Sequence, residues 1–473
     1  MNVRSLGLMA CVTFLLACGG ASVAPEADDP EVVMMEGTLA NRYVVAGQVS
    51  EVISRLRIDT RALEGVERPP INLALVVDTS GSMDGDPISH ARHASLSLLD
   101  VLHPEDRLSV VAFHSETEVL LESTQIGSAE IPELRERIGQ MEARGTTDLA
   151  GGVQAGLEEL VRHFEPEGVN RLVLLSDGVP NDPSGILALA TAAGERGIRI
   201  TALGLGDDYD ETLLGQVAQQ SGGRFHYVSE ASAVAGVFRD EVLRFERLLA
   251  RNVVLELRPG PGVQIDSVLG QPTTASSAGA VRVSLGDVSE GEHRDVVIRM
   301  RAAARRPGAS VELMDAVLSF DDAIQDAGRL ERRVFLGARA TGSQEDLEAG
   351  RDVEVERAAA RMVAAVTTVQ AIERARSGRV EEARAILNQA AREAEMAAAG
   401  DAELESQAGA MRDLGPALAS VAPAPAMDAP MAPSDDVAGA DAPSMNEEPS
   451  IAPGAPARVR AAHSSAMEMM QAH

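Results

Sequence analysis

Short apolar runs alternate with amphipathic stretches throughout residues 71–250, and this rhythm constrains the fold more than any other feature. Runs such as INLALVV, RLSVVAF and NRLVLLS are largely apolar, whereas stretches between them, such as DLAGGVQAGLEELVRHF, have helical periodicity. Strands that are apolar on both sides are typical of a parallel sheet that helices cover on both faces. The sequence therefore predicts a doubly wound α/β domain over 71–250, with a mainly parallel sheet.

The regions on either side of this domain have different patterns. Residues 37–70 and 251–340 alternate in the manner of strands, with glycine and proline at the turns. We expect these two regions to form one β-sandwich, with the α/β domain inserted between its strands. Residues 350–420 show helical periodicity interrupted at Gly378, which predicts a C-terminal helical hairpin. Residues 421–473 are Ala/Pro-rich and acidic with few core-forming side chains, and are predicted to be disordered.

The N-terminus has the features of an export signal. Arg4 precedes an apolar segment that is too short to span a bilayer, so residues 1–17 are predicted to be a signal peptide. The following Leu-Leu-Ala-Cys resembles the lipobox of bacterial lipoproteins, which implies that Cys18 is lipidated and that residues 18–36 form a tether. Cys11 lies within the predicted signal, so the mature chain would have no free thiol. Glycine after Cys18 favours an exported lipoprotein anchored to the outer membrane of the cell envelope.

The chain is strongly acidic and contains no lysine. Its formal net charge is −30, and every strong cation is an arginine. Nucleic acids and anionic headgroups are bound mainly through Lys and Arg, so we expect no nucleic-acid partner and membrane contact only through the lipid anchor. The absence of lysine also excludes Schiff-base catalysis and the phosphate-binding lysine of a P-loop.

Oxygen-bearing side chains occupy alternate positions where the first apolar run ends, at Asp78, Ser80 and Ser82. In open α/β sheets, ligands bind beyond the carboxyl ends of the strands. A nucleophilic serine would need the G-x-S-x-G elbow, which is missing here. A phosphorylated aspartate would need a second acid two residues on, where Ser80 stands. The remaining interpretation is a cage for a hard dication, because Mg²⁺ takes about six oxygen ligands.

Two further loops supply oxygen atoms for such a cage. The stretch ARGTTDLAGGV puts Thr147 in a glycine-led loop before a helix, and LVLLSDGVPND ends a later apolar run at Asp177. The order D-x-S-x-S, Gly-x-Thr and S/T-D-G resembles the von Willebrand factor A domain over roughly 71–250. The resemblance implies a metal-ion-dependent adhesion site for Mg²⁺ or Mn²⁺. Its ligands would be the hydroxyls of Ser80, Ser82 and Thr147, with Asp78 and Asp177 acting largely through water.

The same resemblance implies a non-enzymatic module whose cation captures an Asp or Glu of a partner protein. With the lipid anchor, it predicts a surface-tethered, metal-dependent protein-binding or adhesion module. The alternative is an accessory or assembly subunit of a cell-envelope complex that uses the same clamp. A hydrolase that activates water on the metal is a third class, although no general base is evident near the loop. Asp84 and Asp86 could build an additional Ca²⁺ site.

Overall fold

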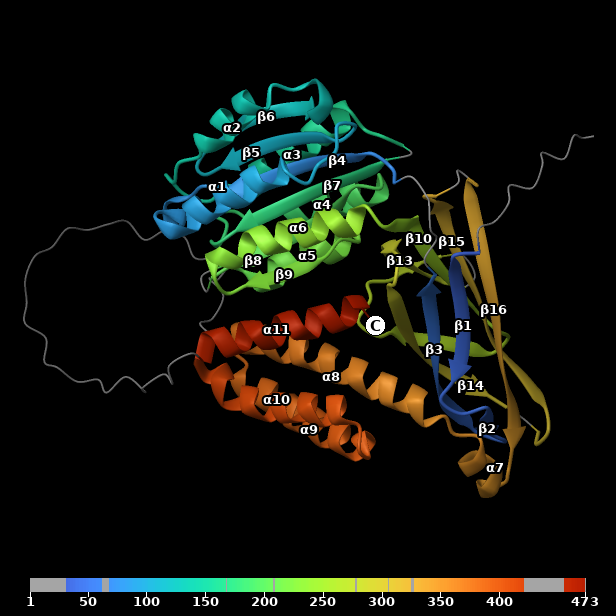
Figure 1. Cartoon of the computed structure of the whole chain (residues 1–473). Coiled ribbons are helices and arrows are strands. Elements are labelled where there is room, and N and C mark those ends of the chain that lie inside the picture. The colour runs from blue at the N-terminus through green and yellow to red at the C-terminus, as the bar shows by residue number, and fades with distance from the viewer. Residues whose placement is uncertain are drawn as a thin grey trace, which may run out of the picture.

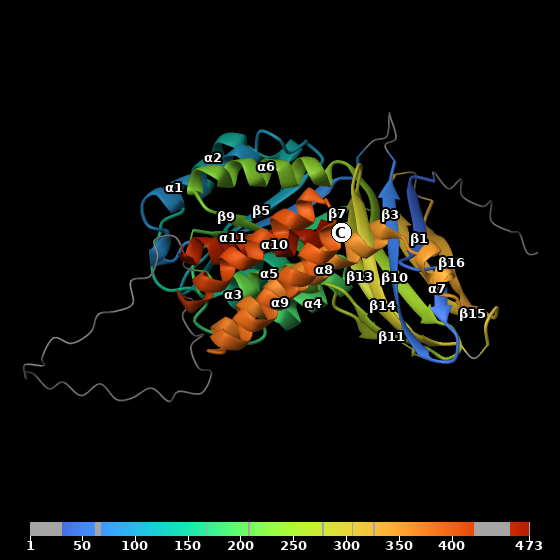
Figure 2. The same ribbon diagram turned by 90° about the horizontal axis from the view of Figure 1, so that it is seen from below.

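The computed structural model describes residues 31–61, 68–166, 168–206, 209–276, 279–304, 306–324, 327–420 and 455–472. These residues form an α/β domain, a β-sandwich and a helical unit that lie against one another (Figures 1 and 2). The predicted doubly wound, mainly parallel sheet flanked by a β-sandwich is confirmed, and a helical region follows the sandwich where a helical hairpin was predicted. The predicted signal peptide (1–17) and Cys18 lie outside the described residues, as does most of the predicted tether (18–36).

The sheet of the α/β domain has six strands in the order β6-β5-β4-β7-β8-β9. Neighbouring strands are parallel, except that β6 is antiparallel to β5. The strands are β4 (Ile71–Asp78), β5 (Arg107–Phe113), β6 (Thr117–Gln125), β7 (Val169–Ser176), β8 (Arg199–Leu205) and β9 (Phe225–Val228). The first apolar run of the domain is thus a central strand, β4.

Helices cover both faces of this sheet. Leu73, Leu75 and Val77 of β4 share one hydrophobic cluster with α1 (Asp86–Leu98), α2 (Ile131–Gly139) and α6 (Val234–Phe245). Ala74 and Val76 belong instead to the cluster of α3 (Leu149–Arg162), α4 (Ile186–Glu195) and α5 (Glu211–Ser221). Since successive side chains of a strand point to opposite faces, β4 is buried on both, which explains its uninterrupted apolar sequence.

The sandwich consists of a four-stranded sheet, β1-β3-β14-β11, and a six-stranded sheet, β12-β13-β10-β15-β16-β2. β3 pairs antiparallel with β14 from Val49 to Asp59, so strands that precede and follow the α/β domain share one sheet. The α/β domain is therefore inserted between β3 and β10. The strands are β1 (Val33–Leu39), β2 (Tyr43–Val45), β3 (Val49–Thr60), β10 (Leu248–Pro259), β11 (Val263–Val268), β12 (Thr274–Ala275), β13 (Val281–Ser289), β14 (His293–Ala303), β15 (Ser310–Asp322) and β16 (Arg329–Thr341).

The prediction of a two-helix hairpin for residues 350–420 is wrong, because three helices form there after the short α7 (Gln344–Ala349). They are α8 (Val353–Arg376), α9 (Val380–Ala398) and α10 (Ala402–Ala417). The break between α8 and α9 contains Gly378 with φ of +78°, and a second break has φ of +39° at Ala399 and +89° at Gly400. Gly400 and Asp401 mark this second break, since Asp401 caps α10 by accepting a hydrogen bond of 2.9 Å from the backbone N–H of Leu404. The two-helix prediction followed the alanine-rich periodicity and did not use this signal.

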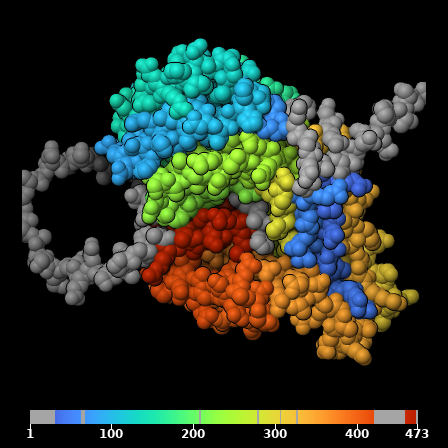
Figure 3. All heavy atoms as spheres, in the orientation of Figure 1, coloured from blue at the N-terminus to red at the C-terminus, as the bar shows by residue number. Residues whose placement is uncertain are grey.

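The prediction of disorder over residues 421–473 is wrong for α11 (Ala455–Ala472), whereas residues 421–454 lie outside the described part. α11 lies between the α/β domain and helices α8 to α10 (Figures 1 and 3). Its Met467 and Met470 are buried in the same cluster as Val217 of α5 and Met362 of α8. Surfaces on both sides of α11 decide its burial, which its Ala- and Met-rich composition does not predict.

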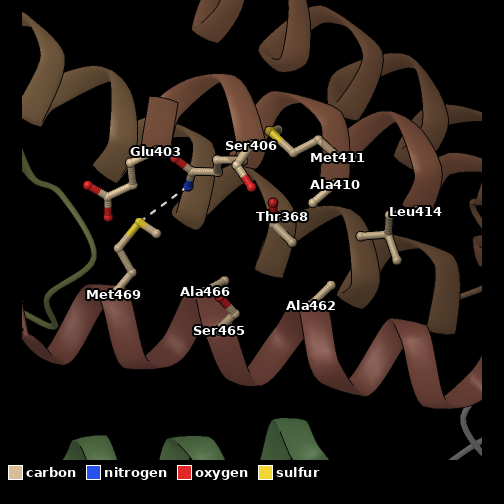
Figure 4. A pocket seen from close by; sticks show the side chains of 11 residues that line it. Thr368, Glu403, Ser406, Ala410, Met411, Leu414, Ala462, Ser465, Ala466 and Met469 are labelled. Carbon is tan, nitrogen blue, oxygen red and sulfur yellow. Dashed lines mark hydrogen bonds between the residues drawn. The ribbon is translucent and has the colours of Figure 1, made fainter. Parts of the chain in front are cut away.

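A cavity of about 310 Å³ separates part of α11 from α8 and α10. Figure 4 shows its lining, with Ala462, Ser465 and Met469 of α11 facing Thr368 and residues of α10. Gln407 Nε2 donates a hydrogen bond of 3.3 Å to Met469 Sδ across one end. In the described part of the chain, no helix combines the length and the apolar character needed to cross a membrane.

Candidate metal site

The candidate site lies where two central strands of the α/β sheet end. β4 and β7 are parallel neighbours, so Asp78 and the residues after Ser176 lie at the same edge of the sheet. The backbone N–H of Gly81 donates a hydrogen bond of 3.1 Å to the carbonyl oxygen of Gly145. This bond joins the loop after β4 to the loop that carries Thr147. Three segments distant in the sequence are thereby held together at one edge.

The hydroxyls and carboxylates of the first and third loops form a continuous set of contacts. Ser80 Oγ lies 3.0 Å from Ser82 Oγ, and Ser82 Oγ donates a hydrogen bond of 2.8 Å to Asp177 Oδ1. The backbone N–H of Ser80 donates a bond of 2.9 Å to Asp78 Oδ1. The structure therefore brings four of the five predicted ligand residues together.

The fifth residue, Thr147, faces the same space across Gly178. A Cβ atom at position 178 would lie 3.1 Å from Thr147 Oγ1, 3.7 Å from Ser82 Oγ and 3.9 Å from Asp78 Oδ2. Oxygen atoms from all three loops therefore surround a space that stays open because residue 178 is glycine. Hydroxyl and carboxylate oxygens are ligands that hard dications prefer, so the residues present fit an ion such as Mg²⁺.

The site is buried on one side and open on the other. Asp78 is 0% exposed, and Thr147 and Asp177 are 7% and 8% exposed, whereas Ser82 is exposed. Burial raises the pKa of Asp78, although hydrogen bonds from Ser176 and Ser80 lower it. A buried carboxylate that remains ionised needs compensating charge. Ser82 marks the side from which an ion and a partner could approach.

Hydroxyl groups contribute as much to this site as acids do. No group of three or more His, Cys, Asp or Glu side chains is placed to hold a metal within the ranges that the structure describes. Two ionised carboxylates would formally balance the charge of a dication, and the three hydroxyls are neutral. Five oxygen-bearing side chains leave room, among the about six oxygen ligands that Mg²⁺ takes, for at least one further oxygen ligand.

The motif S/T-D-G includes Ser176 and Gly178, but sequence reasoning assigned a role only to Asp177. Ser176 Oγ donates a hydrogen bond of 2.6 Å to Asp78 Oδ2 and so orients the carboxylate of the neighbouring strand. Both residues flank Asp177 at the end of an apolar run, and this position in the sequence is the signal that could have identified them. What each one does depends on Asp78 and Thr147, which are far away in the sequence.

Asp84 and Asp86 follow the loop that carries Ser80 and Ser82. Both are exposed, and Asp86 begins α1. An additional Ca²⁺ at these two residues stays a prediction.

Comparisons with known proteins agree with this geometry. Residues 72–240 match the family model of the von Willebrand factor type A domain. The chain is 29% identical over 279 residues to an uncharacterized protein of Synechocystis sp., covering 57% of this chain and 66% of that protein. It is 27% identical over 231 residues to inter-alpha-trypsin inhibitor heavy chain H4 of Homo sapiens, covering 45% of this chain and 25% of that one. The chain thus spans between a quarter and two thirds of the length of these relatives.

Two solved structures share the fold over most of the chain. A von Willebrand factor type A protein from Catenulispora acidiphila has a TM-score of 0.66 at 17% identity, covering 82% of this chain and 89% of that one. The ArnB paralog VWA2 from Sulfolobus acidocaldarius has a TM-score of 0.57 at 16% identity, covering 81% and 94%. At these identities the two likenesses show the fold alone.

Proposed function

Since residues 72–240 form a von Willebrand factor type A domain, we propose that this chain captures a partner protein through a divalent cation, Mg²⁺ or Mn²⁺. Domains of this family commonly mediate metal-dependent protein–protein interactions and are generally not enzymes. The observation that carries the proposal is the convergence of oxygen atoms from three loops on the space beside Gly178. The proposed ligand residues are Asp78, Ser80, Ser82, Thr147 and Asp177.

The residues of the site have distinct tasks in this proposal. The hydroxyls of Ser80, Ser82 and Thr147 coordinate directly, and the carboxylates of Asp78 and Asp177 act largely through water. When bound, the cation supplies an electrophilic position that an Asp or Glu of the partner completes. The exposed Ser82 lies on the side where that carboxylate would arrive. A site of this composition binds an acidic partner even though the chain has a net charge of −30.

We further propose that a lipid on Cys18 tethers the chain to the outer membrane, so that the metal site faces partners at the cell envelope. The support is the sequence from Leu15 to Cys18 alone. Replacing Cys18 by Ser should move the protein from the membrane fraction to the soluble fraction and stop incorporation of labelled lipid. Unchanged fractionation would contradict the anchor and leave the metal site unaffected.

Calorimetric titration of the purified chain with MgCl₂ and MnCl₂ tests the metal site. We expect wild type to bind one cation and Asp78→Ala to lose binding by at least about tenfold, because a buried carboxylate that would hold the cation through water is removed. Asp84→Ala is the matched control, since Asp84 is exposed and lies outside the set of ligands. The proposal is wrong if Asp78→Ala and Asp84→Ala bind the cation equally well.

A further inference from the structure

A second surface with binding character lies on the sandwich, at the end away from the α/β domain, where β2 meets β16 (Figure 1). A groove of about 600 Å³ is open there over the outer face of β15 and β16. Its walls include Phe335, Tyr43, Arg42 and Arg339, and Gly337 lies between them. We call it the Phe335 groove.

Gly337 creates the depth of the Phe335 groove. Residues 335, 337 and 339 of one strand share a face, so the glycine leaves a gap between the side chains of Phe335 and Arg339. A Cβ at Gly337 would lie 3.3 Å from the carbonyl oxygen of Val311 and 3.4 Å from the ring of Phe335. A side chain could therefore be placed there with little displacement, and it would fill the groove.

The groove exposes an aromatic ring in a chain that has few of them. Phe335 is 61% exposed, whereas Phe113, Phe225, Phe238, Phe245 and Phe320 are almost fully buried. Exposed aromatic and arginine side chains are typical of the residues that dominate protein–protein binding energy.

Two arginines beside this ring are not neutralised. Neither Arg42 nor Arg339 forms an ion pair with a carboxylate among the residues that the structure describes. Arg42 stacks over Tyr43 with its Cζ 5.5 Å from the ring centroid, and donates a hydrogen bond of 3.2 Å to the carbonyl oxygen of Ala349. These contacts orient its guanidinium at the groove wall. By contrast Arg333, on the same strand, pairs with Asp315 at 3.5 Å.

The chemistry of the groove selects among classes of ligand. Polyanions such as nucleic acids need many cations, and the lining of this groove contains two arginines. One or two carboxylates beside an apolar side chain match two guanidiniums that have no ion-pair partner among the described residues and lie beside Phe335 and Tyr43.

We propose that the Phe335 groove binds a short acidic peptide segment of another protein, in which Asp or Glu flanks an apolar residue. The apolar side chain packs on Phe335 above Gly337, and the carboxylates pair with Arg42 and Arg339. This surface is separate from the metal site, so the chain would contact partners at two places by two mechanisms.

The test uses the full-length chain in EDTA, so that the metal site cannot bind acidic peptides. The probes are two sets of synthetic heptapeptides. The acidic set contains every combination of Asp or Glu around a Leu, Ile, Phe or Tyr. The amide set contains the same peptides with Asn in place of Asp and Gln in place of Glu. We expect the acidic set to bind wild type at least about threefold more tightly on average than the amide set. Gly337→Val, Phe335→Ser and Arg339→Gln should each remove that preference.

Two controls keep the outcome specific. Met396→Ser removes another exposed apolar side chain, 77% exposed on α9, and should bind the peptides as wild type does. Asp78→Ala should also bind normally, which separates this proposal from that of the metal site. Equal binding of acidic and amide peptides, or normal binding by Gly337→Val, would overturn the proposal. The proposal would also be overturned if no peptide bound and if dextran sulfate, a polyanion, bound to the groove in a way that depends on Phe335.

Discussion

At the scale of single residues, the candidate metal site depends on positions that carry no ligand atom. Ser176 orients Asp78 through a hydrogen bond of 2.6 Å, and Gly178 keeps open the space between Thr147 and Ser82. Hydrogen bonds to a charged group contribute about 1.5–3 kcal/mol, so Ser176 also reduces the cost of burying Asp78. The oxygen ligands are thus held in place before any ion arrives.

Substitution of Gly178 tests whether this open space is the metal site. Gly178→Ala should weaken Mg²⁺ binding by at least about tenfold in calorimetry, because its methyl group would lie 3.1 Å from Thr147 Oγ1. The fold should persist, since the backbone at Gly178 is not in the left-handed region. Gly139→Ala in α2 is the matched control, because a Cβ at Gly139 meets nothing within 4 Å. Equal Mg²⁺ affinity in the two variants would place the ion elsewhere.

At the scale of elements, α11 joins two units of the molecule with few hydrogen bonds. Gln271 Nε2 donates a bond of 2.7 Å to the carbonyl oxygen of Met470, and Gln407 binds Met469. Met467 approaches α5 where Gly215 has no side chain, since a Cβ there would lie 3.2 Å from Met467 Cε. Apolar contact with the α/β domain therefore holds α11 in place.

Replacing Met467 by Asp should release α11 while the rest of the fold remains. A carboxylate buried without a partner costs several kcal/mol, so we expect about 3 kcal/mol of lost stability in the docking of this helix. Hydrogen exchange of residues 455–472 should accelerate at least about tenfold, with exchange in β4 and β7 unchanged. Met396→Asp makes the same chemical change at an exposed position. If Met396→Asp accelerates hydrogen exchange in α11 as much as Met467→Asp does, the proposed docking contact is incorrect.

At the scale of the whole molecule, buried charges join the α/β domain to the sandwich. Asp287 of β13 accepts a hydrogen bond from Arg171 of β7 and lies 3.5 Å from Arg199 Nε of β8. It also accepts a bond of 2.9 Å from the backbone N–H of Asn252. Buried charges are tolerated only with such partners in fixed geometry, so these contacts join the inserted domain to the sandwich.

This junction should make the fold sensitive to acid. The two arginines lower the pKa of Asp287 from its ordinary value to about 2, although burial opposes them. Because the pKa of Asp287 is lower in the folded chain than in the unfolded chain, where it is about 4, its ionised carboxylate stabilises the fold at pH values above about 4. This stabilisation is lost as the pH falls from about 4 towards 2 and the carboxylate becomes protonated. Roughly 2 kcal/mol should be lost over that range in urea unfolding.

Asp287→Asn should abolish this part of the pH dependence. It should also lower stability at pH 7 by about 3 kcal/mol, because Arg171 and Arg199 lose their buried counter-ion. Asp100→Asn, which removes an exposed carboxylate paired with Arg135, should change stability by less than about 1 kcal/mol. If Asp287→Asn loses as much stability as wild type when the pH falls from about 4 to 2, the ion pairs of Asp287 are not the cause of the acid sensitivity.

Part of this architecture is readable from the sequence because the signal is local. Strands buried on both faces need continuous apolar runs, so β4, β5 and β7 are evident. The ends of parallel strands meet at one edge, so oxygen-bearing residues after β4 and β7 point to a shared site. Their role as metal ligands remains a prediction that the titrations above will decide.

The sequence by itself determined the α/β domain, the β-rich flanks and five candidate ligand residues. Only the tertiary structure decided that residues 455–472 form a helix, that Ser176 supports Asp78, and that Arg171 and Arg199 share Asp287. The reason is that periodicity reports how one segment buries its own side chains. Docked helices, buried ion pairs and the Phe335 groove depend on surfaces contributed by residues far apart in the chain.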